Sequence, residues 1–363
     1  MRFKVEKSSL VGAIQVVGNV ITTKSALPIL SNILIEGQMG SLRLTATDLD
    51  IGITCVIPVD TQEIGSITIP AKRFNDIIKE FPLEVINIST KKNNQVTIDS
   101  DMCQFKIMGL AKEEFPKLPE FKDKKAIKIG QALLKQALSL TSFAVSFDET
   151  RYVLNGILFK LSKGVLTLVS TDGKRLAIAE KKLSLEPDVE ISMIVPIKTI
   201  QELNRNLKDD GELSLVVSNN QVLFDLGSVG IVSRLIEGEF PDYKQVVPQA
   251  TENKMKVGRN QFLLAIRRAA LLVTQDYQAV KLEVFKNKLV ISKSTPDVGE
   301  FHEELPVEYQ GRELVIGFNP VYLMDVVKIL SEETICLELI DAEKPGVIRT
   351  NGYVYIVLPM RLN

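Results

Sequence analysis

The sequence predicts an α+β protein made of three repeated domains, each with two helices and several antiparallel strands. Three observations lead to this prediction. The chain has 363 residues, enough for two or three domains at roughly 100–200 residues each. A pattern of apolar residues recurs at intervals of 124 and 128 residues. In every repeat the apolar spacing changes from that of a strand to that of a helix.

Each repeat begins with a short strand that leads into an amphipathic helix. Segments starting at Lys4, Lys128 and Lys256 align without gaps: KVEKSSLVGAIQVV, KIGQALLKQALSLT and KVGRNQFLLAIRRA. Beyond the strand, apolar residues recur three and four positions apart, as on one face of a helix. The matched apolar positions are Val5/Ile129/Val257, Leu10/Leu134/Phe262, Ala13/Ala137/Ala265 and Ile14/Leu138/Ile266.

A second strand and helix follow in each repeat. Segments starting at Ile67, Met193 and Glu313 read ITIPAKRFNDIIKEF, MIVPIKTIQELNRNL and ELVIGFNPVYLMDVVKIL. Each has a proline where the helix is expected to start. Proline is tolerated there because the N–H that it lacks would have no partner inside the helix.

The boundaries of the repeats are marked by proline-rich segments. Runs of Val, Ile, Thr, Leu and Phe between the two helices predict antiparallel strands. The segments 115–119 and 240–248 then close the first two repeats with prolines. We therefore expect domains at residues 1–122, 126–248 and 254–363, with linkers near 122–126 and 249–254.

The overall composition is that of an ordinary globular protein. Hydrophobic residues make up 45% and charged residues 25% of the chain, which argues against a disordered or fibrous protein. The 44 basic and 45 acidic residues give a net charge of −1. The total charge therefore points to neither a nucleic acid nor a membrane as partner.

Several residue types limit the chemistry. Cys55, Cys103 and Cys336 are odd in number and widely spaced, which favours a cytoplasmic protein without disulfides or a metal site. The uncharged stretch 8–23 is not expected to be a signal peptide because similar stretches recur inside the chain. The single histidine, His302, has no Ser or Cys nucleophile near it in sequence, so histidine-dependent catalysis is not expected. We expect no cofactor.

Basic residues are concentrated in the expected helical segments. Together these segments contain fifteen basic and five acidic residues, a net charge of +10, and the rest of the chain carries −11. Such segregation is typical of a basic surface that binds nucleic acid, although solvated helix faces would give the same count. The segments are 4–21, 71–81, 127–146, 197–208, 255–275 and 320–330.

The size of the repeats suggests how such a surface can meet DNA. A domain of about 120 residues is roughly 35 Å across when treated as a sphere. Three such spheres in a ring leave a hole of about 5 Å, whereas six leave about 35 Å. One chain is therefore too small to encircle a duplex, but a head-to-tail pair of chains, a six-domain ring, is large enough. No base-reading motif is recognisable, so binding would be independent of DNA sequence.

The motifs closely resemble those of the bacterial DNA polymerase sliding clamp, the β subunit of the replicative DNA polymerase III holoenzyme. The resemblance covers the whole chain. The segments that carry it are ALPILSNILI (26–35), TDLD (47–50), IPAKRF (69–74), FPKL (115–118), RYVLNGILF (151–159), STDGKRLA (170–177), FPDYKQVVP (240–248), IGFN (316–319) and VLPMRL (357–362).

This resemblance implies the DNA clamp fold and a non-catalytic processivity factor. The expected assembly is a head-to-tail homodimeric ring around double-stranded DNA, with helices lining the hole. The expected partners are the replicative polymerase, the clamp loader and repair proteins, which bind through a short peptide motif. Tethering partners to DNA raises their effective concentration at the primer end.

The resemblance also implies three sets of site residues. The peptide pocket would be formed by Arg151, Leu154, Thr171, Gly173, Arg175, Leu176, Pro241, Val246, Tyr322, Ile356, Leu358, Pro359 and Met360. The DNA-facing residues would be Lys24, Lys72, Tyr152, Lys174, Arg175, Lys198, Arg205, Arg267 and Arg268, the last three drawn from the charge count. The dimer interface would place Phe105 and Ile107 against the partner's Leu271 and Leu272. To this we add our own expectation of a pair at the rim between Arg73 and Glu300, Glu303 or Glu304.

Two alternatives remain at this stage. In an enzyme, the carboxylates of TDLD and STDGKRLA would serve acid–base or Mg²⁺ chemistry. Asp48 and Asp172 occupy equivalent repeat positions, however, which favours a shared role in a turn. The other alternative is a repeat scaffold that binds peptide motifs and never meets DNA.

Overall fold

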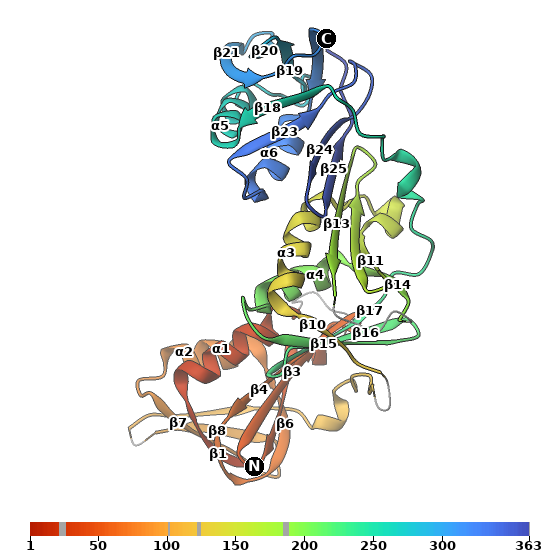
Figure 1. The fold of residues 1–363 in the computed structure, drawn as a ribbon. Helices are drawn as coiled ribbons and strands as arrows, with labels where there is room; N and C mark the ends of the chain where they lie inside the picture. Colours follow the sequence, from red (N-terminus) through yellow and green to blue (C-terminus); the bar gives the residue numbers. More distant parts are fainter. Residues whose placement is uncertain (22–26, 101, 122–124, 184–188, 363) are drawn as a thin grey trace. The chain divides into compact units, whose positions relative to one another are not determined.

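The protein was analysed as a computed structural model that describes residues 1–21, 27–100, 102–121, 125–183 and 189–362. The chain divides into two compact units (Figure 1). One unit contains Met1–Lys135 and Gln201–Leu235, and the other contains Gln136–Ile200 and Ile236–Asn363. The units do not coincide with the three repeats because each unit has a sheet that continues from one repeat into the next.

The first unit holds two antiparallel sheets. In the eight-stranded sheet, β17 of the second repeat pairs with β4 of the first, from Val229 opposite Cys55 to Ser233 opposite Ile51. The five-stranded sheet has the order β5-β1-β7-β8-β9, with β1 (Arg2–Glu6), β5 (Asp60–Glu63), β7 (Val85–Thr90), β8 (Gln95–Asp99) and β9 (Gln104–Met108). The eight-stranded sheet has the order β10-β15-β16-β17-β4-β3-β2-β6, with β2 (Asn32–Gln38), β3 (Ser41–Thr47), β4 (Ile51–Pro58), β6 (Gly65–Pro70), β10 (Ile127–Gly130), β15 (Glu212–Ser218), β16 (Gln221–Asp225) and β17 (Val229–Arg234).

The second unit holds one antiparallel sheet of twelve strands. The second and third repeats join where β13 pairs with β25, from Arg175 opposite Val357 to Ala179 opposite Tyr353. The order is β14-β11-β12-β13-β25-β24-β23-β18-β21-β20-β19-β22. The strands are β11 (Gly156–Ser162), β12 (Val165–Thr171), β13 (Arg175–Lys182), β14 (Ile191–Pro196), β18 (Lys254–Gly258), β19 (Val280–Phe285), β20 (Lys288–Thr295), β21 (Gly299–Glu308), β22 (Leu314–Phe318), β23 (Thr334–Glu338), β24 (Gly346–Thr350) and β25 (Tyr353–Val357).

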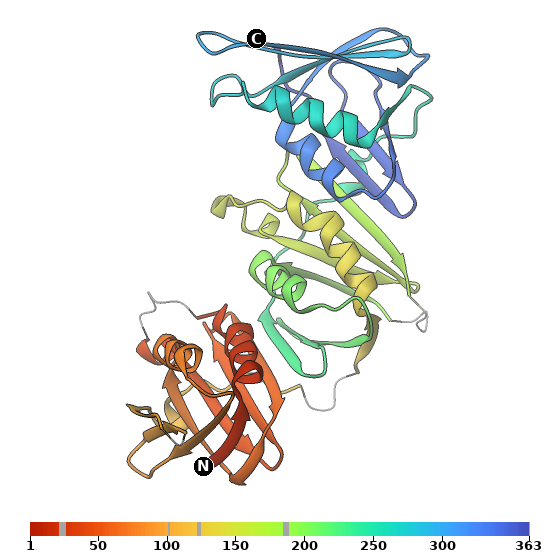
Figure 2. The ribbon, with the colours of Figure 1, turned by 90° about the vertical axis from the view of Figure 1, so that its left-hand side faces the viewer.

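Two helices belong to each repeat, as the apolar spacing predicts. Helices α1 and α2 lie side by side in the first unit, and α5 and α6 do so in the second (Figure 2). The helices are α1 (Lys7–Gly18), α2 (Ala71–Glu80), α3 (Gln131–Thr141), α4 (Ile197–Asn206), α5 (Arg259–Ala270) and α6 (Pro320–Ile329). Short 3₁₀ helices are η1 (Pro28–Ser31), η2 (Lys112–Glu114), η3 (Ser142–Ala144), η4 (Glu149–Leu154) and η5 (Tyr243–Val246).

The helix starts follow the expected chemistry. Pro320 occupies the first turn of α6, and the side chain of Asn319 accepts a hydrogen bond from the N–H of Val321 at 2.9 Å. Pro70 is the N-terminal cap of α2, and Pro196 immediately precedes α4. The predicted proline positions are therefore confirmed at helix starts.

The matched apolar positions form the cores of the repeats. Each of the twelve residues aligned from the strand–helix segments is at most 3% exposed. The three aromatic or leucine side chains at the central position, Leu10, Leu134 and Phe262, are completely buried. The prediction of one buried apolar face in each first helix is confirmed. None of the helices in the described residues has both the length and the apolar character that a membrane span needs.

Candidate functional site

A cavity of about 410 Å³ opens on the second unit and contains the largest group of predicted site residues. Its volume lies within the range of small-ligand and peptide pockets, which is roughly 300–1,000 Å³. Its walls come from the turn between β12 and β13, from the segment around η5 and from the end of β25. The lining residues are Leu154, Thr171, Gly173, Lys174, Arg175, Leu176, Phe240, Pro241, Asp242, Tyr243, Val246, Pro345, Ile356 and Leu358.

The floor of this pocket is part of the hydrophobic core. Leu176 of β13 and Ile356 of β25 lie opposite each other in the paired strands and are almost fully buried. Phe240 and Tyr243 pack against the same core cluster while remaining partly exposed. An apolar floor anchored in a rigid sheet suits the apolar side chains of a bound peptide.

The turn between β12 and β13 has a backbone that favours glycine, although Leu49 adopts a similar φ of +81° in the equivalent turn of the first repeat. Asp172 accepts hydrogen bonds at Oδ1 from the N–H groups of Lys174 (2.9 Å) and Arg175 (3.0 Å). Gly173, which lies between Asp172 and Lys174, has a φ of +84°, a region that favours glycine. A Cβ at this position would also lie 2.8 Å from Nη1 of Arg151. The positive φ therefore disfavours other residues here, whereas the flexible end of the Arg151 side chain can move away from a Cβ.

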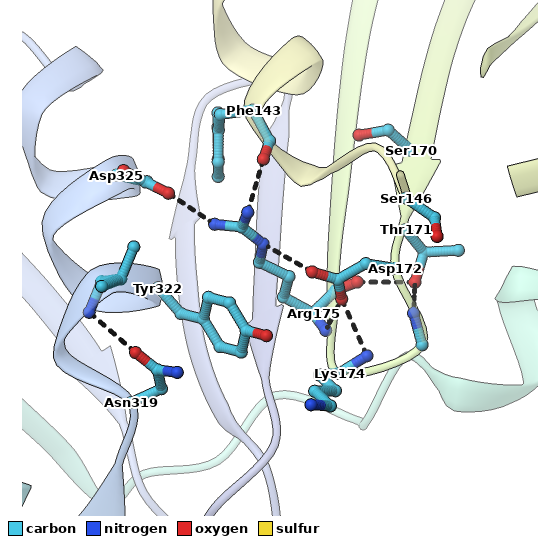
Figure 3. A network of polar contacts seen from close by, with 12 residues as sticks. Phe143, Ser146, Ser170, Thr171, Asp172, Lys174, Arg175, Asn319, Tyr322 and Asp325 are labelled. Atoms are coloured by element: carbon cyan, nitrogen blue, oxygen red, sulfur yellow. Dashed lines mark hydrogen bonds and ion pairs between the residues drawn. The ribbon is translucent and has the colours of Figure 1, made fainter. Parts of the chain in front are cut away.

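The guanidinium of Arg175 forms the polar centre of the site (Figure 3). Its Nη1 donates to Oδ2 of Asp325 at 2.7 Å, and its Nε donates to Oδ2 of Asp172 at 3.0 Å. Nη2 donates to the carbonyl oxygen of Phe143 at 2.6 Å. The guanidinium also lies 4.4 Å from the ring centre of Tyr322, within the range of a cation–π interaction.

These contacts keep Arg175 charged although its side chain is only 9% exposed. Burial alone lowers the pKa of the guanidinium, but the hydrogen bond to Asp325 and the nearby charges of Asp172 and Asp325 outweigh it, so the pKa is raised. Burial also raises the pKa of Tyr322, whose ring lies against the guanidinium. The cluster therefore contains one permanent cation and two acids next to an apolar pocket.

The structure brings nine of the thirteen residues expected in the pocket to its lining. Tyr322 lies behind the lining, against Arg175, and Arg151 lies beside Gly173. Met360 lines a separate cavity together with Arg361 and Leu362, and its N–H donates to the carbonyl oxygen of Gly317 at 2.8 Å. The residues expected there but absent from the lining are Arg151, Tyr322, Pro359 and Met360, and those that sequence reasoning missed are Lys174, Phe240, Asp242, Tyr243 and Pro345.

The three domains of the chain match a single protein family. Family models for the N-terminal, central and C-terminal domains of the DNA polymerase III beta subunit match residues 1–119, 128–242 and 244–361. The chain belongs to the DNA polymerase III beta subunit family. The predicted α+β fold with three repeated clamp domains is thereby confirmed.

Individual relatives agree over the full length. The chain is 32% identical to the beta sliding clamp of Chlamydia muridarum, covering 100% of both proteins, and 33% identical to that of Bacillus subtilis, covering 99% and 100%. The crystal structure of the B. subtilis DNA polymerase sliding clamp matches with a TM-score of 0.96 at 32% identity. A Pseudomonas aeruginosa sliding clamp bound to griselimycin matches with a TM-score of 0.95 at 32% identity, and both structures cover 100% of each chain.

The basic residues expected to face DNA in this clamp subunit occupy several elements. The six helices in the described residues contain eleven basic and four acidic residues, a net charge of +7. Lys4, Lys128 and Lys256 lie in strands β1, β10 and β18 instead. Lys72 is on α2, Lys198 and Arg205 are on α4, Arg267 and Arg268 are on α5, Tyr152 is in η4, and Lys174 is in the β12–β13 turn, whereas Lys24 lies outside the described residues.

Three of these residues form ion pairs within the chain. Arg175 is held by Asp172 and Asp325 beneath the pocket, so its buried guanidinium does not present a free charge to DNA. Arg268 donates from Nε to Glu303 at 2.8 Å and makes a second hydrogen bond from Nη2 to the same carboxylate at 2.5 Å. Arg205 is likewise paired, with the buried carboxylate of Glu202. The net positive charge that reaches solvent is therefore smaller than the count suggests.

Two of the strand edges that lack a partner strand within the described residues lie near the residues expected at the dimer interface. Strand β9 is the last strand of the five-stranded sheet and pairs only with β8. Strand β21 pairs with β20 from Gly299 to Pro306, but with β18 only at Val307 and Glu308. An open edge is a template for a strand from another chain.

The residues expected at the dimer interface lie on or near these edges. Phe105 of β9 is 37% exposed, but Ile107 is only 8% exposed and belongs to the core of its own sheet. Leu271 caps the C-terminal end of α5 and is 78% exposed, and Leu272 follows it half-buried. These positions leave Phe105 and Leu271 as the more exposed apolar contacts.

Ion pairs within the chain reduce the number of acidic residues that can pair with Arg73 at the expected interface. Glu303 is bound by Arg268, and Glu304 is bound by Lys288 at 3.2 Å. Glu300 accepts a hydrogen bond from Ser294 and forms no ion pair among the described residues. Glu300 is therefore the best remaining candidate to pair with Arg73 of a second chain.

The carboxylates considered for catalysis have a structural role. Asp48 accepts hydrogen bonds at Oδ1 from the N–H groups of Asp50 (3.0 Å) and Ile51 (2.8 Å), as Asp172 does in the equivalent turn. The predicted shared turn role is confirmed. Across the described residues, no three His, Cys, Asp or Glu side chains are grouped closely enough to hold a metal ion.

Proposed function

We propose that two copies of this chain form a head-to-tail ring that encircles duplex DNA. The ring slides without reading sequence and tethers the replicative polymerase, the clamp loader and repair proteins. It acts in the cytoplasm as a processivity factor and catalyses no reaction itself. The observation that carries this proposal is the match of three consecutive clamp domains over the entire chain, with a TM-score of 0.96 to a solved sliding clamp.

The open strand edges support a head-to-tail dimer. Pairing β9 of one chain with the open part of β21 in the other would extend both sheets and satisfy their backbone groups. Phe105 would then meet the exposed Leu271 of the second chain, and Arg73 would face Glu300 at the rim. Because β9 of one chain meets β21 of the other, the interface is heterologous. Two such interfaces form a closed ring when the rotation between the subunits allows it.

The charge distribution supports contact with the DNA backbone. The net charge of +7 on the helices lies in a protein whose total charge is −1. Exposed cations such as Lys72 and Arg267 attract phosphates at any sequence, and salt weakens this attraction. Topological enclosure, not this weak attraction, would hold the ring on DNA.

The apolar pocket supports binding of a short extended peptide. Its floor of Leu176 and Ile356 accepts apolar anchors, and Leu358 and Val246 on its walls remain exposed. Relatives of known structure bind griselimycin, which shows that members of this family accept ligands. A peptide motif carried by many partners would let them share one ring.

Primer extension on circular DNA tests this function. A singly primed circular template is incubated with the cognate polymerase and its ATP-driven loader, with and without the protein. The expected result is a large increase in product length per binding event when competitor DNA traps released polymerase. Products of equal length in both reactions would contradict the proposal and favour the scaffold alternative.

A further inference from the structure

The segment between α5 and β19, residues 271–279, carries two of the residues expected at the dimer interface. It contains no helix or strand. Leu271 at its start is 78% exposed. The side chain of Leu272 reaches the beginning of the open strand β21, where its Cδ2 lies 4.0 Å from the position that a Cβ on Gly299 would take. The placement of both leucines therefore depends on the contacts that hold this segment.

Two buried side chains of β20 hold the segment near both of its ends. Nζ of Lys293 donates to the carbonyl oxygens of Tyr277 at 2.7 Å and Ala279 at 2.9 Å. The hydroxyl of Thr295 donates to the carbonyl oxygen of Leu272 at 2.6 Å. Lys293 and Thr295 are 6% and 4% exposed, and they lie two positions apart on the strand, so they share one face of the sheet. One strand thus supplies three hydrogen bonds to a segment that has no ladder of its own.

Lys293 is unusual for a buried lysine. Its hydrogen-bond acceptors are neutral carbonyl oxygens, and it forms no ion pair in the part of the chain that the structure describes. Its Nζ also lies 5.8 Å from the ring centre of Tyr277, and burial lowers its pKa. Lysine is seldom buried without a charged partner. The two bonds to residues 277 and 279 indicate that this lysine serves to hold the segment.

We propose that Lys293 is a positioning residue that holds Leu271 and Leu272 ready for contact with a second chain. This inference rests on the proposed head-to-tail dimer. A segment that is ordered before association loses less conformational entropy when the interface forms. Because a closed ring of two chains contains two identical interfaces, each loss of order weakens the ring twice.

The test measures the dimer dissociation constant of the full-length protein by fluorescence-detected sedimentation over a dilution series. Lys293→Met keeps a long, unbranched apolar side chain but removes the donor. The dissociation constant should rise by about tenfold for each interface, hence by about a hundredfold for the closed ring. Lys286→Met is the matched control, because it removes the same charge from an exposed position in the turn between β19 and β20. It should dimerise as the wild type does.

Two further comparisons separate positioning from a merely structural effect. Thr295→Val removes the bond to the carbonyl oxygen of Leu272 at nearly constant side-chain volume and should also weaken the dimer. It carries the test if circular dichroism shows that Lys293→Met does not fold. In a double-mutant cycle, Lys293→Met should weaken the dimer less when Leu271 is already alanine, because the contact that it positions is then absent.

The outcomes distinguish this inference from the function on which it rests. If the wild-type protein is a monomer at every concentration, the head-to-tail dimer itself is wrong, and the inference falls with it. If the wild type dimerises but folded Lys293→Met and Thr295→Val proteins stay within twofold of its dissociation constant, the positioning role alone is overturned. Equal effects of Lys293→Met with and without Leu271, or equal weakening by Lys286→Met, also overturn it.

Discussion

Replacing Leu358 by alanine tests the pocket most simply. Leu358 follows β25, lines the cavity and is 45% exposed in the free protein. A bound peptide can cover only that exposed part. Full burial of a leucine side chain stabilises by about 1.5–3 kcal/mol, so the exposed part corresponds to about 0.7–1.4 kcal/mol. The expected effect on the peptide Kd is an increase of roughly three- to tenfold.

The substitution should leave the pocket otherwise intact. The N–H of Leu358 donates to the carbonyl oxygen of Lys174 at 2.9 Å, and this backbone bond survives removal of the side chain. The tail therefore keeps its position against the β12–β13 turn. Met360→Ala is a matched control, because Met360 is two residues further on and does not line the cavity.

The assay is a titration of the protein into a fluorescein-labelled peptide with Leu and Phe anchors, followed by anisotropy. Leu358→Ala should weaken binding, while Met360→Ala should bind as the wild type does. The reasoning is refuted if the Kd of Leu358→Ala stays within twofold of wild type, or if Met360→Ala weakens binding equally. Either result would place the peptide elsewhere on the surface.

Three further predictions concern the turn, the interface and the core. Gly173→Ala should lower the stability of the second unit by about 1–2 kcal/mol, because alanine is strained at the positive φ of this turn; an unchanged midpoint of thermal unfolding would contradict that strain. Leu271→Asp should shift the dimer toward monomer in sedimentation velocity, whereas Leu264→Asp, at an exposed position earlier on the same helix, should not; equal masses for both variants would refute the interface. Phe262→Ala should lower the stability of the third repeat by about 3–5 kcal/mol, because a fully buried ring is removed, and a calorimetric scan without a lowered transition would contradict the burial.

The repeat pattern made most of the fold predictable from sequence. Buried positions such as Leu134 and Ala265 must keep their apolar character in every repeat, and their spacing therefore reports the helix face that packs on the sheet. The helix ends were less predictable. Lys4 and Lys256 lie in strands that immediately precede the helices, so the expected helical segments were too long and their charge was overestimated.

The pocket was only partly predictable, for two physical reasons. The resemblance placed Met360 beside Leu358 in the pocket, but β25 ends at Val357, and beyond the end of a strand the alternation of faces no longer fixes where a side chain lies. Contacts between distant segments depend on tertiary packing. The pairing of Arg175 with Asp325, and of Arg268 with Glu303, therefore had no local signal. Phe240 and Tyr243 did have one, since both belong to the recognised segment 240–248.

Topological linkage to DNA is the most direct test of the proposed ring. The protein is loaded onto a nicked circular duplex by its cognate ATP-driven loader and passed through a sizing column in high salt. The proposed ring should remain on the circle in high salt, which removes electrostatic binding, and should leave when a restriction enzyme linearises the DNA. Loss of the protein from the intact circle in high salt, with the loader shown to be active on another clamp, would contradict encirclement.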